Sequence, residues 1–169
     1  MEKLNKSMNI HFTDKFRRVL TLPRLSQEDF VTHDLTRWYA NIFSIEKNTY
    51  ILTTNPASLL SVVIDGGDIT HIGDYLARFL LGLQQLLDEL GMPKVYENKI
   101  NPYTQSFTLI KTLNRSVLGS MNDMVNICRS VAVRENSSPQ LMTTMINETP
   151  YTGIAYRRPK EAFAKMSLN

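Results

Sequence analysis

The most constraining stretch of the sequence is residues 72–90, where apolar side chains recur at the spacing of an α-helix. The pattern consists of Ile72, Tyr75, Leu76, Phe79, Leu80, Leu83, Leu86, Leu87 and Leu90. It stops before Gly91 and Pro93, and this pair is typical of a helix C-terminus. We therefore predict one long amphipathic helix, whose apolar face is wide enough to cover one side of a β-sheet.

Three segments that precede this helix have the composition of β-strands. They are RWYANIFSI at 37–45, TYILTT at 49–54 and SLLSVVID at 58–65. Only the short polar or proline-containing breaks EKN and NPA separate them, and such breaks are expected of hairpin loops. We expect three adjacent antiparallel strands.

One further strand is predicted before this unit and another after it. MNIHFT at 8–13 alternates apolar and polar residues, and QSFTLIKT at 105–112 has the composition of a strand. Thr13 is a good N-cap for a short helix after the first strand, which would bury Phe16, Val19 and Leu20. The segments 21–36 and 92–103 show few periodic apolar positions, so we expect them to be irregular.

The rest of the chain is predicted to be mainly helical. Residues 114–133 form a second long helix, Pro139 starts a short helix after Ser137 and Ser138, and another begins near Pro159. The order predicts an α+β fold: a mainly antiparallel sheet of about five strands, two long helices packed against it, and a short helical tail. We expect a single domain over 1–169, with the α+β core at 8–133 and a helical or irregular tail at 134–169.

Composition narrows the classes of protein. The chain has 169 residues, 43% of them hydrophobic, and its one cysteine, Cys128, lies among apolar residues and excludes an intramolecular disulfide. Residues 1–12 lack the apolar run of a secretory signal, and no stretch approaches the ~18 apolar residues of a membrane span, so we expect a cytoplasmic protein without membrane contact. Because Gly-rich phosphate loops, HExxH and CxxC motifs are absent, we predict no metal and no cofactor, and we interpret DGGD at 65–68 as a turn.

The net charge is only +3, but it is unevenly distributed. Residues 1–24 carry Lys3, Lys6, Lys15, Arg17, Arg18 and Arg24 against Glu2 and Asp14, and the tail adds Arg157, Arg158, Lys160 and Lys165 against Glu161. The middle of the chain is mainly acidic. If the two ends converge, they form a basic patch for phosphates or an acidic partner; otherwise these residues are scattered, solvated charges.

The predicted helix at 114–133 has two contrasting sides. Its apolar side consists of Val117, Leu118, Met121, Met124, Val125, Cys128 and Val131, and Asn114 is a good N-cap. The opposite side carries a row formed by Arg115, Gly119, Asn122, Asn126 and Arg129. A solvated face usually carries strong helix formers, whereas each glycine costs about 1 kcal/mol relative to alanine. The row is therefore either a surface for a ligand or partner, or a face that bonds to neighbouring loops between the sheet and the tail.

The strand RWYANIF carries a second unusual residue. Alternation places Tyr39, Asn41 and Phe43 on one face of the strand, and Trp38 on the other. An amide among aromatic side chains needs hydrogen-bond partners if it is buried. Asn41 either bonds to a loop or reaches the same site as Arg115, and the two aromatic rings either lie in the core or stack on a base.

Together, RWYANIFSI, YILTTN and TLNRSVLGSMNDM resemble a family of uncharacterised bacterial proteins, a domain of unknown function. The family pattern is a W-[YH]-A-N-L strand, a hairpin that ends in T-N or V-N, and a later K-T-x-x-R-S-V helix that contains an asparagine. The similarity covers residues 8 to about 132. The positions that match the family pattern are Trp38, Ala40, Asn41, Asn55, Lys111, Thr112, Arg115, Ser116, Val117 and Asn122. The family strand usually continues into a basic pair, whereas IEKNTY supplies only Lys47.

Some relatives resemble the N-terminal part of passenger proteins encoded by plasmids and insertion elements. The resemblance therefore implies a bacterial or phage protein in a mobile-element or defence context, with no assigned activity, and it marks Arg115, Asn122 and Asn41 as positions of interest.

These observations lead to three hypotheses about function. The first is a non-enzymatic binding module that engages a protein partner or nucleic acid through the row from Arg115 to Arg129 and the basic termini. The second is an enzyme acting on a nucleotide or nucleic acid, with Arg115 as an anion clamp and Asp123 or His11 as the proton-transfer group; it requires these groups and Asn41 to converge in one pocket. The third is a structural protein whose methionine-rich segment LMTTMI packs on a second copy.

Overall fold

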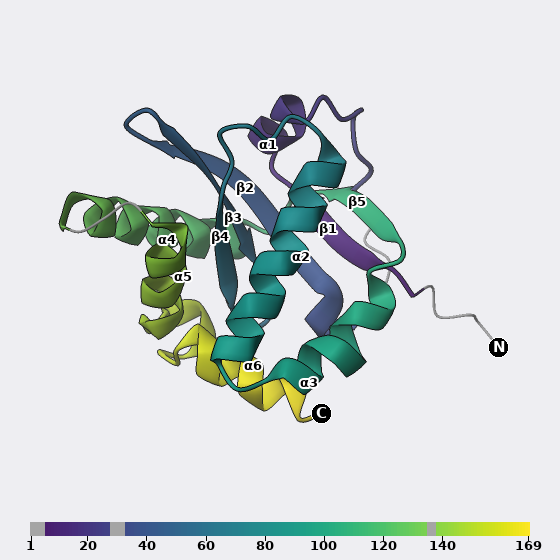
Figure 1. Cartoon of the computed structure of the whole chain (residues 1–169), viewed down its shortest axis with the longest axis vertical. Coiled ribbons are helices and arrows are strands. Elements are labelled where there is room, and N and C mark those ends of the chain that lie inside the picture. Colours follow the sequence, from purple (N-terminus) through teal and green to yellow (C-terminus); the bar gives the residue numbers. More distant parts are fainter. Residues whose placement is uncertain (1–5, 28–32, 135–137) are drawn as a thin grey trace.

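The computed structural model describes residues 6–27, 33–134 and 138–169. Some residues named above lie outside the described residues, namely Lys3, Ser137 and residues 28–32 of the segment that was predicted to be a loop. The strands are β1 (Met8–Phe12), β2 (Arg37–Ile45), β3 (Asn48–Thr54), β4 (Ser61–Asp65) and β5 (Phe107–Lys111). The helices are α1 (Asp14–Val19), α2 (Ile72–Glu89), α3 (Pro93–Val95), α4 (Arg115–Arg134), α5 (Pro139–Glu148) and α6 (Pro159–Ser167) (Figure 1). The predicted α+β class is confirmed.

The five strands form one mixed sheet in the order β4-β3-β2-β1-β5. The predicted antiparallel unit is present, because β3 pairs antiparallel with both β2 and β4. However, β1 pairs parallel with both β2 and β5, so the sheet is not mainly antiparallel. The physical reason is that helical connections, through α1 and through α2, return the chain to the end of the sheet from which it came, and such a crossover places the next strand parallel.

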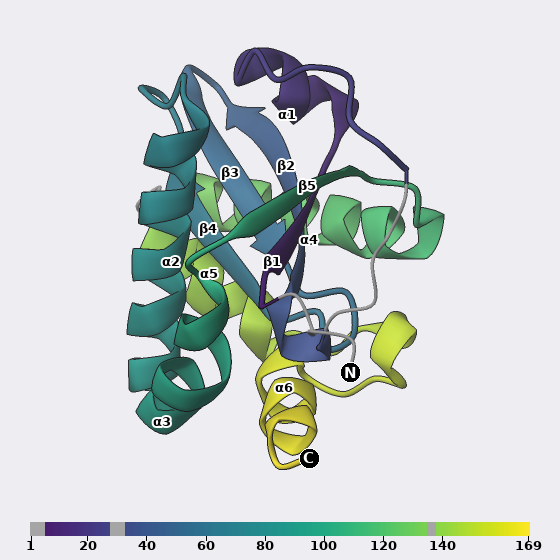
Figure 2. The ribbon, with the colours of Figure 1, turned by 90° about the vertical axis from the view of Figure 1, so that its right-hand side faces the viewer.

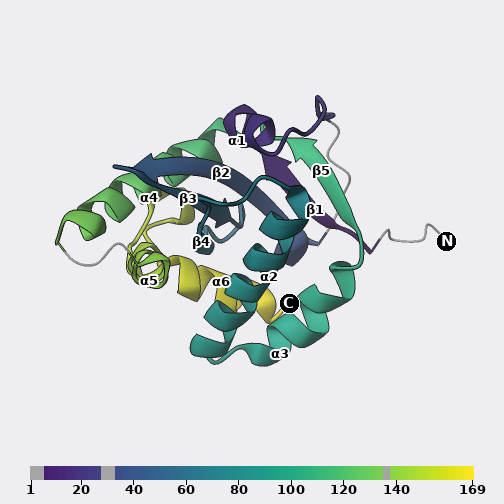
Figure 3. The same ribbon diagram turned by 45° about the horizontal axis from the view of Figure 1, so that its top comes forward.

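Alternation along the strands gives the sheet two buried faces. The first face carries Trp38, Ala40 and Ile42 and packs against α1 and α2, while α6 adds Phe163. The second face carries Tyr39, Phe43 and Leu52 and packs against α4 and α5. Figures 2 and 3 show α2 on one side of the sheet and α4 on the other. The layers are thus helix, sheet, helix, with apolar clusters on both sides of the sheet.

The helix α2 lies very close to strand β4. A Cβ atom placed on Gly82 would lie only 2.8 Å from Cγ1 of Val62. Gly82 is therefore needed for the close approach of helix and sheet. The helix is followed by Gly91 at a φ of +73°, as the predicted stop requires.

The helix α5 covers the outer edge of the sheet with side chains. Thr143 Oγ1 accepts a hydrogen bond from the Val63 amide at 3.0 Å. Asn147 accepts from the Ser61 amide at 2.9 Å and donates to the Ser61 carbonyl at 2.8 Å. These two residues, one helical turn apart, satisfy backbone groups of the edge strand β4 that a neighbouring strand would otherwise pair with.

Three local predictions are wrong. Residues 92–103 were expected to be irregular but form successive helical turns, because Tyr96 and Ile100 are buried in the core beside the first face. The last strand of the antiparallel unit starts at Ser61 rather than residue 58, because Asn55 Oδ1 accepts the Ser58 amide and closes a loop. Val19 was expected to be buried but is 41% exposed.

Candidate functional site

The helix α4 separates its apolar and polar sides as predicted. Asn114 Oδ1 accepts hydrogen bonds from the amides of Ser116 at 3.0 Å and Val117 at 3.2 Å, and so caps the helix. The buried residues are Val117, Met121, Met124, Val125, Cys128 and Val131, while Leu118 is half-buried. The row is exposed along its whole length, at Arg115, Gly119, Asn122, Asn126 and Arg129.

The row makes few contacts with the described part of the chain. A Cβ atom on Gly119 would meet nothing within 4 Å. Arg129 Nη1 donates to Asn126 Oδ1 at 3.5 Å, a long bond within the row itself. The tail reaches α4 on another side, where a Cβ on Gly153 would lie 3.4 Å from Ser120 Oγ. Packing against described neighbours therefore does not explain the glycine and asparagines of the row.

A groove between α4 and α5 adjoins the row. Its volume is about 430 Å³, and its lining consists of Asn126, Ile127, Ser130, Val131, Arg134, Leu141 and Met145. The apolar wall is partly open to solvent, since the Met145 residue is 42% exposed. Asn126 belongs both to the row and to the groove, so the two form one continuous surface.

Asn41 lies in a structural contact at the start of α1. Thr13 Oγ1 donates to Asn41 Oδ1 at 2.8 Å, and the same hydroxyl accepts from the Phe16 amide at 3.3 Å as the N-cap of α1. Asn41 thus holds the residue that caps a helix, which agrees with the loop-bonding interpretation. The neighbouring rings are core residues, because Trp38 is fully buried and Tyr39 is 7% exposed, so neither is available to stack on a base.

The basic segments near the two ends of the sequence do not meet. The helices α1 and α6 lie at opposite ends of the molecule (Figures 1 and 2), so Arg17 and Arg18 of α1 do not form one patch with the cations of the tail, and the alternative of scattered charges holds for them. The reason is that β1 carries the chain across the sheet before α1 begins.

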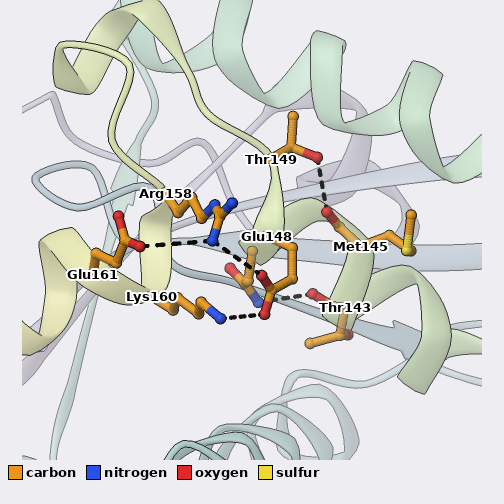
Figure 4. Close-up of polar contacts among 8 residues, drawn as sticks. Thr143, Met145, Glu148, Thr149, Arg158, Lys160 and Glu161 are labelled. Atoms are coloured by element: carbon orange, nitrogen blue, oxygen red, sulfur yellow. Dashed lines mark hydrogen bonds and ion pairs between the residues drawn. The ribbon is translucent and has the colours of Figure 1, made fainter.

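Two glutamates pair with cations at the end of the molecule where α6 lies. Arg158 Nη1 is 3.9 Å from Glu148 Oε2 and 3.8 Å from Glu161 Oε1, and Lys160 also pairs with Glu148 (Figure 4). These pairs bring the loop before α6, and α6 itself, against the end of α5.

The groups named for the enzyme hypothesis are not gathered in a pocket. His11 is 3% exposed and stacks on Tyr39 with ring centroids 4.4 Å apart, whereas Asp123 is exposed on α4. Neither Arg115 nor Asn41 lines any of four pockets in residues 6–27, 33–134 and 138–169, which include the groove between α4 and α5. Cys128 is a buried core thiol, and burial raises its pKa to about 12, so it stays protonated at neutral pH.

Among the described residues, no three His, Cys, Asp or Glu side chains lie together as a candidate metal site. None of the helices in the described segments has the length and apolar character needed to cross a bilayer.

A family model described as a domain of unknown function, DUF6933, matches residues 9–162, which is most of the chain. The chain belongs to the DUF6933 family. The predicted membership of an uncharacterised domain family is thereby confirmed. No curated protein matches the chain. Within this DUF6933 protein, the matched range contains both the row and the groove.

The groove of the DUF6933 protein was not predicted, although the sequence carries a weak signal for it. Ile127 and Val131 on α4, and Leu141 and Met145 on α5, are apolar pairs at a spacing of four residues. The sequence places each pair on one side of its own helix. How the two helices lie against each other depends on the sheet beneath them, which the spacing does not show.

Proposed function

We propose that this DUF6933 protein is a non-enzymatic binding module, and that it engages a protein partner through the surface formed by the groove and the row. The observation that carries the proposal is the open apolar groove beside a helix face whose glycine serves no contact in the described chain. An exposed glycine in a helix interior costs stability, so a partner that approaches the helix backbone closely would account for it.

The chemistry of the surface favours a polypeptide over a nucleic acid. Ile127, Leu141 and Met145 offer apolar contacts, and methionine and arginine are enriched in protein interfaces. The two arginines of the row are 14 positions apart, about 21 Å along the helix axis. Nucleic acids are usually held by many cations along the phosphate backbone, whereas the row supplies only these two and the groove adds only Arg134.

The same surface defines the chemistry of the partner. The segment that binds would place apolar side chains in the groove and carboxylates beside Arg129 and Arg134. An amphipathic helix with acidic residues beside its apolar face meets both requirements. The resemblance to plasmid and insertion-element proteins supports a bacterial or phage partner in a mobile-element or defence context.

A site-specific photo-crosslinker tests the proposal. Asn126 is replaced by a photoreactive amino acid in cells that express the protein naturally, and Gln84, exposed on α2, is replaced in the same way as the control. We expect position 126 to crosslink to a second protein and position 84 not to do so. The crosslinked protein is identified by mass spectrometry.

Two further variants make the outcome specific to the surface. Met145→Glu places a charge in the groove and Arg129→Glu reverses a charge of the row, and both residues are exposed, so the fold is expected to persist by circular dichroism. Each variant should weaken the crosslink at position 126. Crosslinks to nucleic acid, crosslinks only to a second copy of the chain, or equal crosslinks at positions 126 and 84 would each overturn the proposal; the second of these would favour the self-assembly hypothesis.

A further inference from the structure

A pocket lies at the end of the sheet where the parallel strands β1 and β5 both finish. Its volume is about 330 Å³, and four cations face it, namely Arg17, Arg18, Arg24 and Lys111. Its one carboxylate is Asp14, and its apolar wall consists of Phe12 and Leu25. The pocket shares no lining residue with the groove between α4 and α5.

Asp14 orients the two arginines of α1. Its carboxylate pairs with Arg17 Nε at 2.9 Å and with Arg18 Nη2 at 2.6 Å. The hydrogen bond from Arg17, together with the charges of Arg17, Arg18 and Lys111, lowers the pKa of Asp14, so the carboxylate is ionised at neutral pH. Because Asp14 occupies only part of each guanidinium, N–H donors of both arginines remain for another acceptor.

The segment after α1 places Arg24 at the pocket. Thr21 has a φ of +54°, a left-handed conformation that is rare for a β-branched residue, and it turns the chain back. Arg17 Nη1 donates to the Leu22 carbonyl at 2.9 Å and holds this turn. The Lys111 amide donates to the Ser26 carbonyl at 2.9 Å, so the segment that carries Arg24 is joined to the end of β5.

The cations exceed the carboxylates at this pocket. Asp14 pairs with two of the four cations, whereas the structure gives no ion-pair partner in the described residues for Arg24 or Lys111. Like charges held around one cavity repel each other unless an anion joins them. At the α6 end, by comparison, Arg158 and Lys160 each have a glutamate partner.

We propose that this pocket binds the phosphate group of a small molecule. Three guanidinium groups and one ammonium group match the several oxygens and the double charge of a phosphate better than the single charge of a carboxylate. The volume lies at the lower end of the roughly 300–1,000 Å³ range of small-molecule sites. An organic group attached to the phosphate would contact Leu25. The phosphate therefore comes either as the inorganic ion or as a phosphomonoester such as a nucleoside monophosphate.

Isothermal titration calorimetry at constant ionic strength tests the site, with inorganic phosphate in one arm and a nucleoside monophosphate in the other. We expect saturable binding of at least one compound by the unmodified protein. Binding of inorganic phosphate alone would identify the ion as the source, whereas tighter binding of the monophosphate would identify the phosphomonoester. The absence of saturable binding in both arms would overturn the proposal.

Two variants with the same loss of charge locate the binding. Arg24→Gln with Lys111→Gln removes the two cations that lack a carboxylate partner in the described chain, and should weaken binding at least ~10-fold, since charged hydrogen bonds are lost. Lys15→Gln with Lys47→Gln removes two exposed cations that do not line the pocket, and should leave the affinity unchanged. Circular dichroism confirms that both variants fold. An equal loss of affinity in the two variants would show a non-specific charge effect and overturn the site.

Discussion

The two long helices, α2 and α4, cover opposite faces of the same sheet, yet their glycines differ in what they contact. A Cβ on Gly82 of α2 would lie 2.8 Å from Val62 Cγ1, whereas a Cβ on Gly119 of α4 would meet nothing within 4 Å. Packing therefore explains the first glycine and leaves the second unexplained. A weak helix former therefore points to binding only where no contact within the fold requires it.

The exposed sides of the two helices also differ, because an arginine on α2 has a carboxylate partner within the protein and, in the described chain, the arginines of the row on α4 do not. Arg78 of α2 donates two hydrogen bonds to the Asp68 carboxylate, at 2.7 and 2.8 Å. Arg115 and Arg129 of α4 have no carboxylate partner among the described residues. The arginine of α2 is thus paired within the protein, whereas the two arginines of the row on α4 carry donors that a partner can use.

We expect the largest effects on stability when a buried side chain on the inner side of either helix is truncated. These effects show whether the two inner sides contribute equally to the core. Phe79 of α2 is fully buried against Trp38, and Met124 of α4 is fully buried on the other face of the sheet. Phe79→Ala should lower the free energy of unfolding by about 3–5 kcal/mol, and Met124→Ala by about 2–5 kcal/mol, because each leaves a cavity. Urea denaturation measures both. A cost below about 1 kcal/mol for Met124→Ala would mean that α4 is not a full member of the core.

The second effect tests the explanation given for Gly82. Gly82→Ala should lower the free energy of unfolding by about 1–3 kcal/mol, because the added methyl group overlaps a side chain that the sheet holds in place. The matched control is Gly73→Ala, near the start of the same helix, where an added Cβ meets nothing within 4 Å. If Gly82→Ala were as well tolerated as this control in urea denaturation, the close approach of α2 to β4 would be wrong.

Much of the fold follows from local patterns in the sequence. The period of two in RWYANIFSI assigned Trp38 and Tyr39 to opposite faces, and the helical period located α2 and α4 to within a few residues. Asn114 was identified as the N-cap of α4 because capping depends only on the next three residues.

Other features depend on contacts between distant segments. The parallel pairing of β1 with β5 joins residues about a hundred positions apart, and the sequence of neither strand indicates which strand it pairs with. Thr143 and Asn147 looked like ordinary helix residues, since their role exists only where α5 meets the edge of β4. The sequence leaves open, for the same reason, whether its basic ends converge: it shows how many charges the chain carries, but not where they lie in space.

The two long helices also differ in how their N-termini are capped, and this difference should have a smaller effect on stability. Asn114 caps α4 with two hydrogen bonds, whereas His71, which precedes α2, makes no side-chain capping bond. Asn114→Ala should therefore cost about 1 kcal/mol of stability, and His71→Ala should cost much less. Urea denaturation of both variants decides this. Equal costs would show that the cap of α4 contributes little beyond what α2 achieves without one.

If the row on α4 serves a partner and not the fold, Gly119→Ala should raise the stability of the protein and weaken its binding at the same time. Because nothing lies within 4 Å of the added methyl group, the variant should be more stable by about 0.5–1 kcal/mol in urea denaturation. The same methyl group should weaken the crosslink formed from position 126, because it lies where a partner would approach the helix. A variant that is less stable than the unmodified protein, or one that is more stable and crosslinks equally well, would contradict the account.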